Sequence, residues 1–210
     1  LDEAEAALAD LDVITERSAA PTSPIFPRAL GTAFEALPDP VRQTHMTLGT
    51  SRWVGRCDVE RGAGLWPRLL CALFRFPPAA TDIEVEVTKT VTARGETWLR
   101  RFGRHRFRSH LSLGSEGMRE RFGPFVFSLG LQVRDDALHY PVSRGRLGPL
   151  PLPRWLMPVS VAREFASEGR FRFDVALLAP VTKRPLVRYR GFLTAKAPDD
   201  PTRPPSRDRR

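Results

Sequence analysis

Trp98 to Val133 contains one short phrase twice, and this repeat decides the fold. In the first copy, Arg101-Phe102-Gly103 is followed, at every second position, by Phe107, Ser109, Leu111 and Leu113. In the second copy, Arg121-Phe122-Gly123 is followed at the same spacing by Phe127, Leu129, Leu131 and Val133. Apolar residues at every second position are typical of a half-buried strand, and glycine permits a tight turn between two strands. The stretch therefore predicts consecutive antiparallel strands joined by hairpins.

The same period extends on both sides of the repeat and predicts about ten strands in all, from Ser51–Glu60 to Leu186–Ala195. Within this series we expect single strands over Phe125–Arg134 and Leu138–Leu147. A short apolar helix, Leu65–Phe76, follows the first strand and is stopped by two prolines. Helices also precede the first strand, over Ile25–Leu48.

These elements predict a β-rich α+β fold. Because a large antiparallel sheet tends to curl or close in order to remove its edges, we expect a strongly curved, calycin-like sheet or barrel. A two-sheet sandwich is the alternative.

The chain divides into three parts by composition. Residues 1–24 are expected to form an acidic helix and a linker from an upstream region, because six Asp or Glu stand there beside one Arg and the chain begins at Leu1. Residues 25–196 are expected to form one β-rich domain. Residues 197–210, rich in Pro and Arg, are expected to be a disordered tail.

Composition excludes several classes of protein. With 41% hydrophobic and 27% charged residues the chain is globular, and no apolar run is long enough for a transmembrane helix. Cys57 and Cys71 belong to no CxxC pair, so we expect reduced thiols and a cytoplasmic protein. No phosphate-binding loop, dinucleotide fingerprint or metal-ligand spacing is present, so neither a cofactor nor a metal is expected.

The net charge of +9 favours anionic partners. Arg104, Arg106 and Arg108 alternate with the apolar residues of their strand, which predicts a solvated outer face with cross-strand ion pairs. An anion-binding face is the alternative, since arginine suits bidentate contacts with phosphate or carboxylate. Nucleic acid is disfavoured, because the aromatic residues that would stack on bases point to the opposite face.

The apolar face is the candidate ligand site. Val161 and Phe165 are expected to point to the same apolar face. On the short helix, Trp66, Leu69, Leu70 and Phe74 would cover one mouth of a cavity. The residues proposed to contact a ligand are Phe107, Ser109, Phe127, Arg163, Phe173 and Tyr189. An apolar cavity with a few polar groups is the usual form of a small-molecule site. The alternative is a packed core in which Arg163 is paired with a carboxylate, because a buried arginine is costly unless paired.

Residues for catalysis are few. His45, at the end of the second helix, and the carboxylates Glu164 and Asp174 are the candidates for acid–base chemistry. Each of these residues is more commonly a helix cap or a surface residue.

Several spaced phrases resemble one bacterial family. They include Leu37-Pro38 with His45, the two phrases of the repeat, and the segments Gly169–Val175 and Leu186–Gly191. In these phrases the chain resembles the family of domains of unknown function DUF4166, over about Ile25 to Ala195. The resemblance implies a module that often follows a saccharopine-dehydrogenase-like or epimerase-like oxidoreductase domain, and it implies no catalytic residues.

Three functions remain open. The first is an accessory domain that binds an apolar small molecule or lipid-like group beside an upstream dinucleotide-binding domain. The second is an enzyme that uses His45, Glu164 or Asp174. The third is a basic module that docks an acidic protein partner.

Overall fold

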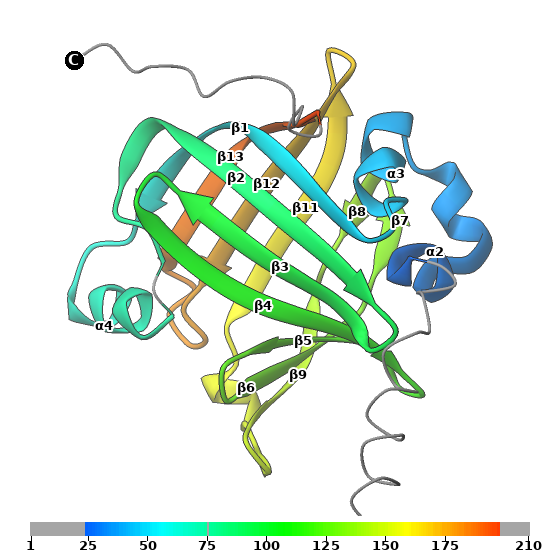
Figure 1. Cartoon of the computed structure of the whole chain (residues 1–210). Helices are drawn as coiled ribbons and strands as arrows, with labels where there is room; N and C mark the ends of the chain where they lie inside the picture. Colours follow the sequence, from blue (N-terminus) through cyan, green and yellow to red (C-terminus); the bar gives the residue numbers. More distant parts are fainter. Residues whose placement is uncertain (1–23, 75, 198–210) are drawn as a thin grey trace, which may run out of the picture.

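A computed structural model describes residues 24–74 and 76–197, apart from the side chain of Trp66. Within them one sheet of thirteen strands dominates the molecule (Figure 1). The helices are α2 (Ile25–Leu30), η1 (Gly31–Ala36), α3 (Asp39–His45), α4 (Leu65–Leu73) and η2 (Arg154–Leu156). The strands are β1 (Thr50–Arg61), β2 (Ala80–Thr92), β3 (Gly95–Phe102), β4 (His105–Gly114), β5 (Gly117–Phe122), β6 (Phe125–Leu129), β7 (Gln132–Arg134), β8 (Ala137–His139), β9 (Val142–Leu147), β10 (Leu150–Pro151), β11 (Val159–Ser167), β12 (Arg170–Leu178) and β13 (Pro185–Ala195).

Every pair of neighbouring strands is antiparallel, in the order β10-β9-β6-β5-β4-β3-β2-β1-β13-β12-β11-β8-β7. The predicted antiparallel β-rich fold, its N-terminal helices and the short helix after the first strand are therefore confirmed. The number of strands differs from the prediction of about ten. The order is also open, with β10 and β7 at its two ends, so the hydrogen-bonded ladder does not close into a barrel.

The repeated phrase forms two hairpins, β3–β4 and β5–β6, as its period predicted. Gly103 and Gly123 occupy the two turns with φ of 53° and 54°. Side chains rarely adopt this left-handed backbone conformation, so glycine at these positions is a requirement of the turn. The two hairpins are adjacent, because β4 also pairs with β5.

The extra strands arise where two predicted strands each break in two. The stretch predicted as Phe125–Arg134 becomes β6 and β7, and the stretch predicted as Leu138–Leu147 becomes β8 and β9. Pro141 lies at the second break, and it has no N–H with which to continue a ladder. After the breaks β6 pairs with β9, whereas β8 pairs with β7 and β11.

Two short connections consequently join the opposite ends of the strand order. Residues 130–131 lead from β6 to β7, and residues 140–141 lead from β8 to β9. A connection of two residues spans at most about 11 Å, so the end of β6 lies close to the start of β7, and the end of β8 lies close to the start of β9. The connections are also bonded to each other, since the backbone N–H of Gly130 donates to the carbonyl oxygen of Pro141 at 2.8 Å.

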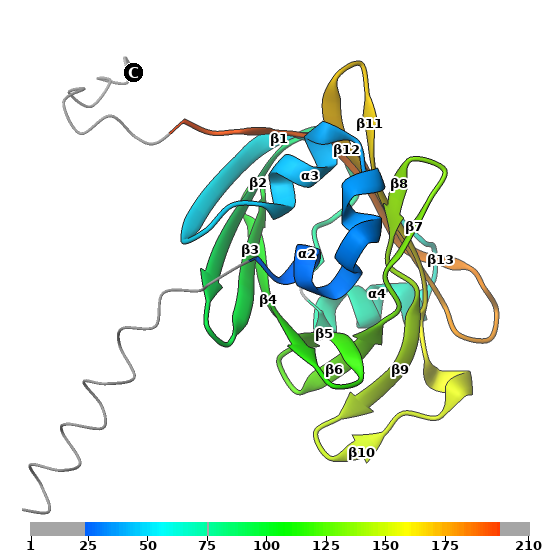
Figure 2. The ribbon, with the colours of Figure 1, turned by 90° about the vertical axis from the view of Figure 1, so that its right-hand side faces the viewer.

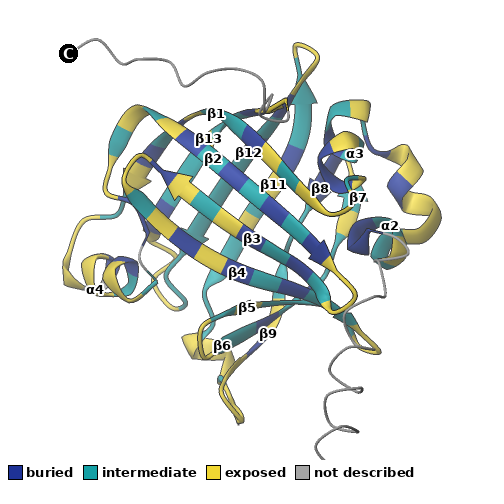
Figure 3. Cartoon of the chain, in the orientation of Figure 1, coloured by how far each residue is buried: buried dark blue, intermediate teal, exposed yellow. Residues whose placement is uncertain are grey.

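The N-terminal helices pack over one end of the sheet, where α3 contacts β11 and β12 and α2 contacts β4 (Figure 2). Phe26, Phe34 and Val41 from these helices are fully buried. The helix α4 lies away from them and packs on β13, where the Cys71 thiol donates to the carbonyl oxygen of Leu186 at 3.5 Å. Burial alternates along the strands, which gives the sheet a buried face and an exposed face (Figure 3).

The exposed face carries cross-strand ion pairs, as the alternation predicted. Glu86 on β2 accepts hydrogen bonds from Arg52 on β1 at 3.1 Å and from Arg101 on β3 at 2.9 Å. Arg188 on β13 makes a bidentate contact with Asp174 on β12, at 2.9 and 2.7 Å. Exposed pairs of this kind stabilise the fold by only about 0–1 kcal/mol each. Their main effect is to make this face of the sheet hydrophilic.

None of the helices in the described parts combines the length and the apolar character that a membrane span requires. The predicted acidic N-terminal segment and the predicted C-terminal tail lie outside the described residues, apart from Pro24 and Ala197.

Gly191→Ala should destabilise the junction of the first and last strands. An added Cβ would meet the carbonyl oxygen of Arg56 and lie 2.6 Å from Cβ of Cys57, so β1 and β13 would have to separate. We expect a loss of about 1–3 kcal/mol in the free energy of unfolding, measured by urea denaturation. Gly114→Ala is the control, because its Cβ would find no atom closer than 3.9 Å. Equal effects of the two substitutions would contradict the steric explanation.

Candidate functional site

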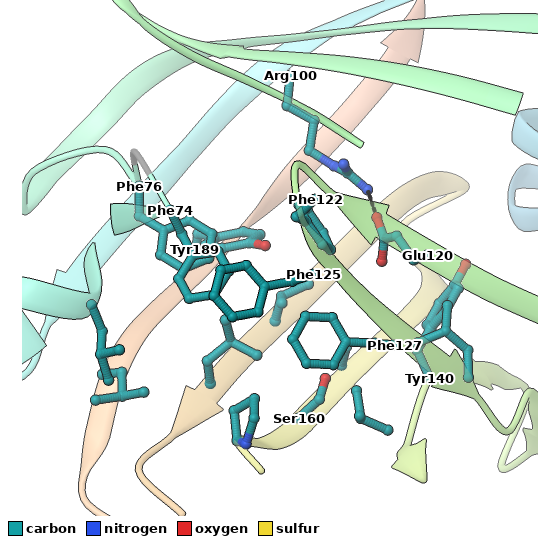
Figure 4. Close-up of a pocket in the computed structure, with 18 of the residues that line it drawn as sticks. Phe74, Phe76, Arg100, Glu120, Phe122, Phe125, Phe127, Tyr140, Ser160 and Tyr189 are labelled. Carbon is teal, nitrogen blue, oxygen red and sulfur yellow. Dashed lines mark hydrogen bonds and ion pairs between the residues drawn. The ribbon is translucent and has the colours of Figure 1, made fainter. Parts of the chain in front are cut away.

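A cavity of about 710 Å³ lies against the buried face of the sheet. Its walls come from β2 to β6 on one side and from β11, β12 and β13 on the other, and α4 borders it. Strands from both halves of the strand order therefore contribute to one space. Eight phenylalanines line the cavity, and Figure 4 labels five of them: Phe74, Phe76, Phe122, Phe125 and Phe127.

The aromatic rings hold each other in place. The ring of Phe74, just after α4, lies 5.0 Å from that of Phe125 on β6, and the rings of Phe125 and Phe127 are stacked at 6.4 Å. Phe76 contacts Phe107 on β4 edge to face at 5.5 Å. Such arrangements suit aromatic pairs, and they connect α4 to strands that are far from it in the sequence.

One side of the cavity carries an ion pair. Arg100 on β3 donates to Oε1 of Glu120 on β5 at 3.2 Å and to the hydroxyl of Ser109 at 2.7 Å (Figure 4). The guanidinium also lies over the ring of Trp98, 4.7 Å from its centroid. A buried arginine is tolerated when it is paired in this way.

A second polar cluster joins α3 to β11. His45 Nε2 lies 2.6 Å from Oε2 of Glu164, and the Tyr140 hydroxyl donates to the same oxygen at 2.6 Å. Tyr140 stands at the crossing between β8 and β9, and its backbone N–H donates to the carbonyl oxygen of Ala162 on β11. The crossing therefore brings the Tyr140 hydroxyl to Glu164, and both residues line the cavity.

Lys89 on β2 is the third polar element, and only 4% of it is exposed. Its ammonium donates to the carbonyl oxygen of Thr44 at 2.7 Å and lies 4.2 Å from the centroid of the Trp98 ring. Glu96 stands nearby and accepts hydrogen bonds from the Trp98 indole at 3.0 Å and from the backbone N–H of Ile25 at 3.2 Å. Lys89 thus ties the end of α3 to the inner face of β2.

Burial and neighbouring charges set the protonation of these groups. Burial lowers the pKa of Lys89 to about 8, against the attraction of Glu164 and Glu96. Burial and the charge of Lys89 lower the pKa of His45, against the attraction of Glu164 and Glu96. Burial alone would raise the pKa of Glu164, but His45, Lys89 and Tyr140 outweigh it and hold that pKa below its usual value.

Several polar atoms at the cavity have no partner within the described residues. Oε1 of Glu164 and Oε2 of Glu120 accept no hydrogen bond there, because each carboxylate uses only its other oxygen. The hydroxyl groups of Tyr189 and Ser160, which also line the cavity, form none (Figure 4). Burial raises the pKa of Tyr189 to about 12, so this hydroxyl keeps its proton. These groups could bind a polar group of a ligand.

The structure separates the predicted ligand contacts into two sets. Phe127, Phe173 and Tyr189 line the cavity. Phe107 and Ser109 are buried behind its wall, where Phe107 packs on Phe102 at 5.7 Å and Ser109 accepts from Arg100.

The predicted parity of β11 is wrong. Val161 is 56% exposed, and Arg163 is exposed with its guanidinium over the ring of Phe165 at 4.5 Å, although Arg163 is also among the residues that border the cavity. Glu164 faces inward instead, because His45 and Tyr140 satisfy its carboxylate there. Arg163 and Asp174 are direct cross-strand neighbours on β11 and β12.

The three predicted acid–base residues do not form one site. His45 and Glu164 meet at 2.6 Å, whereas Asp174 lies on the exposed face and is bound by Arg188. Of the residues expected to cover the mouth, Leu70 and Phe74 line the cavity and Leu69 is exposed. The side chain of Trp66 lies outside the described part of the chain.

The polar residues of the site that were not predicted are Lys89, Arg100, Glu120, Tyr140, Ser160 and Thr182. Lys89 has the parity of Val85, Val87 and Val91, and Arg100 has the parity of Trp98 and Phe102. A charged residue in an inward position was therefore a visible signal for both. Among residues 24–74 and 76–197, no group of three or more His, Cys, Asp or Glu is arranged to hold a metal ion.

One family model matches this chain. Its description is "Domain of unknown function (DUF4166)", and the match covers residues 37–193, which is more than half of the chain. No curated protein and no solved structure gave a significant match.

Lys89→Met should reveal the cost of burying the ammonium through its dependence on pH. Between pH 8 and pH 10 the unfolded chain keeps a proton on Lys89 that the folded protein releases, so the stability of the wild type rises with pH. Relative to Lys89→Met, we expect the free energy of unfolding of the wild type to increase by about 2 kcal/mol over this window.

The measurement is urea unfolding at pH 8 and pH 10, with Lys183→Met as the control for loss of an exposed lysine. A difference between wild type and Lys89→Met that does not change with pH would contradict the prediction.

Proposed function

The chain belongs to the DUF4166 family, and we propose that its domain binds an apolar small molecule in the cavity of its sheet. The observation that carries this proposal is the cavity itself. Its volume of about 710 Å³ lies within the range of small-molecule sites, and its walls are aromatic and aliphatic. A ligand that binds the folded protein in a cavity of this size would stabilise the fold.

The polar groups of the cavity favour a ligand without net charge. Of the five charged residues that line the cavity, Lys89 and Arg100 face Glu120 and Glu164, and the fifth, Arg163, is exposed to water. A charged ligand would leave this balanced set with an unpaired buried charge, which is costly. We therefore assign the ligand as a mainly apolar molecule with a hydroxyl or similar donor. The donor would bind the free oxygens of Glu120 and Glu164.

The cellular setting belongs to the same proposal. The family resemblance implies a neighbouring oxidoreductase domain, and the ligand would then be a substrate or product that the cavity presents to it. Cys57 and Cys71 are free and buried, and burial raises the pKa of Cys57 to about 12. Unreactive free thiols suit the reducing cytoplasm.

Phe127→Arg should abolish ligand retention. Phe127 lines the cavity and is buried, so an arginine there would place an unpaired charge in apolar space. We expect native mass spectrometry and organic extraction of the purified chain to find a bound apolar molecule in the wild type. In Phe127→Arg its amount should fall at least about tenfold.

The matched control is Leu99→Arg, which places the same charge on the exposed face of β3. Circular dichroism establishes that both variants fold. If the folded wild type carries no extractable molecule and no apolar probe stabilises it, the proposal fails.

An enzyme is the second candidate, and the contact of His45 and Tyr140 with Glu164 favours it. The carboxylate is buried, oriented by two hydrogen bonds and free at one oxygen, which suits a group that moves a proton. The test is to incubate the extracted molecule with fresh protein and to search for a product of changed mass. Under this hypothesis Glu164→Gln would still bind the molecule but would yield no product.

A further inference from the structure

The mouth of the cavity has an unusual surface. We define the mouth by four exposed residues that also line the cavity: Leu73 on α4, Trp155 and Leu156 on η2, and Val181 in the turn between β12 and β13. Trp155 is 66% exposed and Val181 is 72% exposed. Large apolar side chains in water are informative when they are contiguous, and these border one opening.

The exposed apolar surface continues beyond the mouth. Leu65 and Leu69 on α4 are 82% and 59% exposed, and Leu150 on β10 is exposed as well. Together with the mouth they occupy three segments, namely α4, residues 147–156 and residues 179–184. In Figure 1 these segments lie on the side of the sheet away from the N-terminal helices (α4, the yellow segment after β9 and the orange turn before β13), and residues of all three line the one cavity. In Figure 3 much of α4 is coloured as exposed.

The charge of the same three segments has one sign. They contain Arg68, Arg154, Lys183 and Arg184, all of them exposed, and no Asp or Glu. None of these four side chains forms an ion pair with another described residue. On the exposed face of the sheet, Arg52, Arg101, Arg188 and Arg190 are paired with carboxylates, whereas Arg104, Arg106 and Arg108 form no ion pair with a described residue. The three segments around the mouth therefore combine exposed apolar side chains with exposed cations and carry no acidic residue.

We propose that this surface docks on an anionic lipid membrane, so that the cavity opens directly onto the bilayer. This inference rests on the proposed function, because a mouth that loads an apolar ligand needs a source of it. Exposed leucine and tryptophan side chains enter the interfacial region of a bilayer, and arginine and lysine are attracted to anionic headgroups. An acidic protein partner would explain the cations, but it would not need an open apolar cavity at the centre of the contact.

The chemistry of the cavity agrees with this route. Its apolar walls begin at the mouth residues and continue inward to Phe125 and Phe127, while Arg100, Glu120 and Glu164 also line it. A molecule with an apolar body could pass from the bilayer along this wall without exposing that body to water. The docking surface and the cavity then serve one transfer step, in which no bond is made or broken.

The test is co-sedimentation of the full chain with vesicles. We expect binding to vesicles of phosphatidylcholine and phosphatidylglycerol, and little binding to phosphatidylcholine alone. The double variant Leu69→Ser with Trp155→Ser should lower the partition coefficient at least about tenfold, because two apolar side chains no longer enter the bilayer. Leu99→Ser with Val161→Ser is the matched control, since both residues are exposed on the other face and the net charge is unchanged.

A second pair of variants separates docking at the mouth from general attraction of a basic protein. Arg154→Ser with Lys183→Ser should weaken binding to the anionic vesicles more than Arg104→Ser with Arg106→Ser, although both remove two exposed cations. Equal losses for the mouth variants and their controls, or no binding by the wild type, would overturn the proposal. Binding to an acidic protein but not to vesicles would do so as well.

The outcome also distinguishes this inference from the proposed function. Phe127→Arg changes the cavity and leaves the mouth intact, so it should still bind vesicles while it loses the ligand. A wild type that retains a ligand but ignores vesicles would refute only the docking. A wild type that binds vesicles but holds no apolar molecule would refute only the ligand site.

Discussion

The crossing at Gly130 and Tyr140-Pro141 is the constraint on which the rest of this structure depends. Two connections of two residues each join strands at opposite ends of a thirteen-stranded order, and a hydrogen bond from Gly130 to Pro141 links them. Because so short a connection cannot reach far, β6 is held close to β7 and β9 close to β8, although no ladder joins them. The cavity lies within this arrangement and takes its walls from strands of both halves.

A polar cluster around Glu164 connects the crossing to the N-terminal helices. Glu164 receives hydrogen bonds from His45 on α3 and from Tyr140 at the crossing, and Lys89 binds the end of α3 through Thr44. A buried carboxylate is costly unless it is satisfied, so each partner depends on the others being in place. One set of contacts therefore orders the helices, the crossing and the polar side of the cavity.

The two ends of the cavity have opposite physical character. The interior carries the facing charges of Lys89, Arg100, Glu120 and Glu164, whereas the mouth is apolar and its segments carry exposed cations without an acidic residue. A packed core would not require this gradient, and a purely basic docking face would not require a cavity. The proposed ligand site and the proposed membrane contact explain the two ends separately, and they share only the wall of phenylalanines between them.

The sequence by itself determined the antiparallel strands, the glycine turns and the short helix after β1, because these depend on local periodicity and backbone freedom. Gly103 and Gly123 could be assigned to turns from the chain alone, and the inward positions of Phe127, Phe173 and Tyr189 followed from a period of two. The inward-facing residues of β11 could not be predicted in this way. Glu164 is buried there by contacts with His45 and Tyr140, which lie 119 and 24 residues away in the sequence. Tertiary structure alone decided that the chain would cross at Pro141, bring Tyr140 to Glu164 and leave a cavity. These outcomes depend on long-range pairing, which no local pattern records.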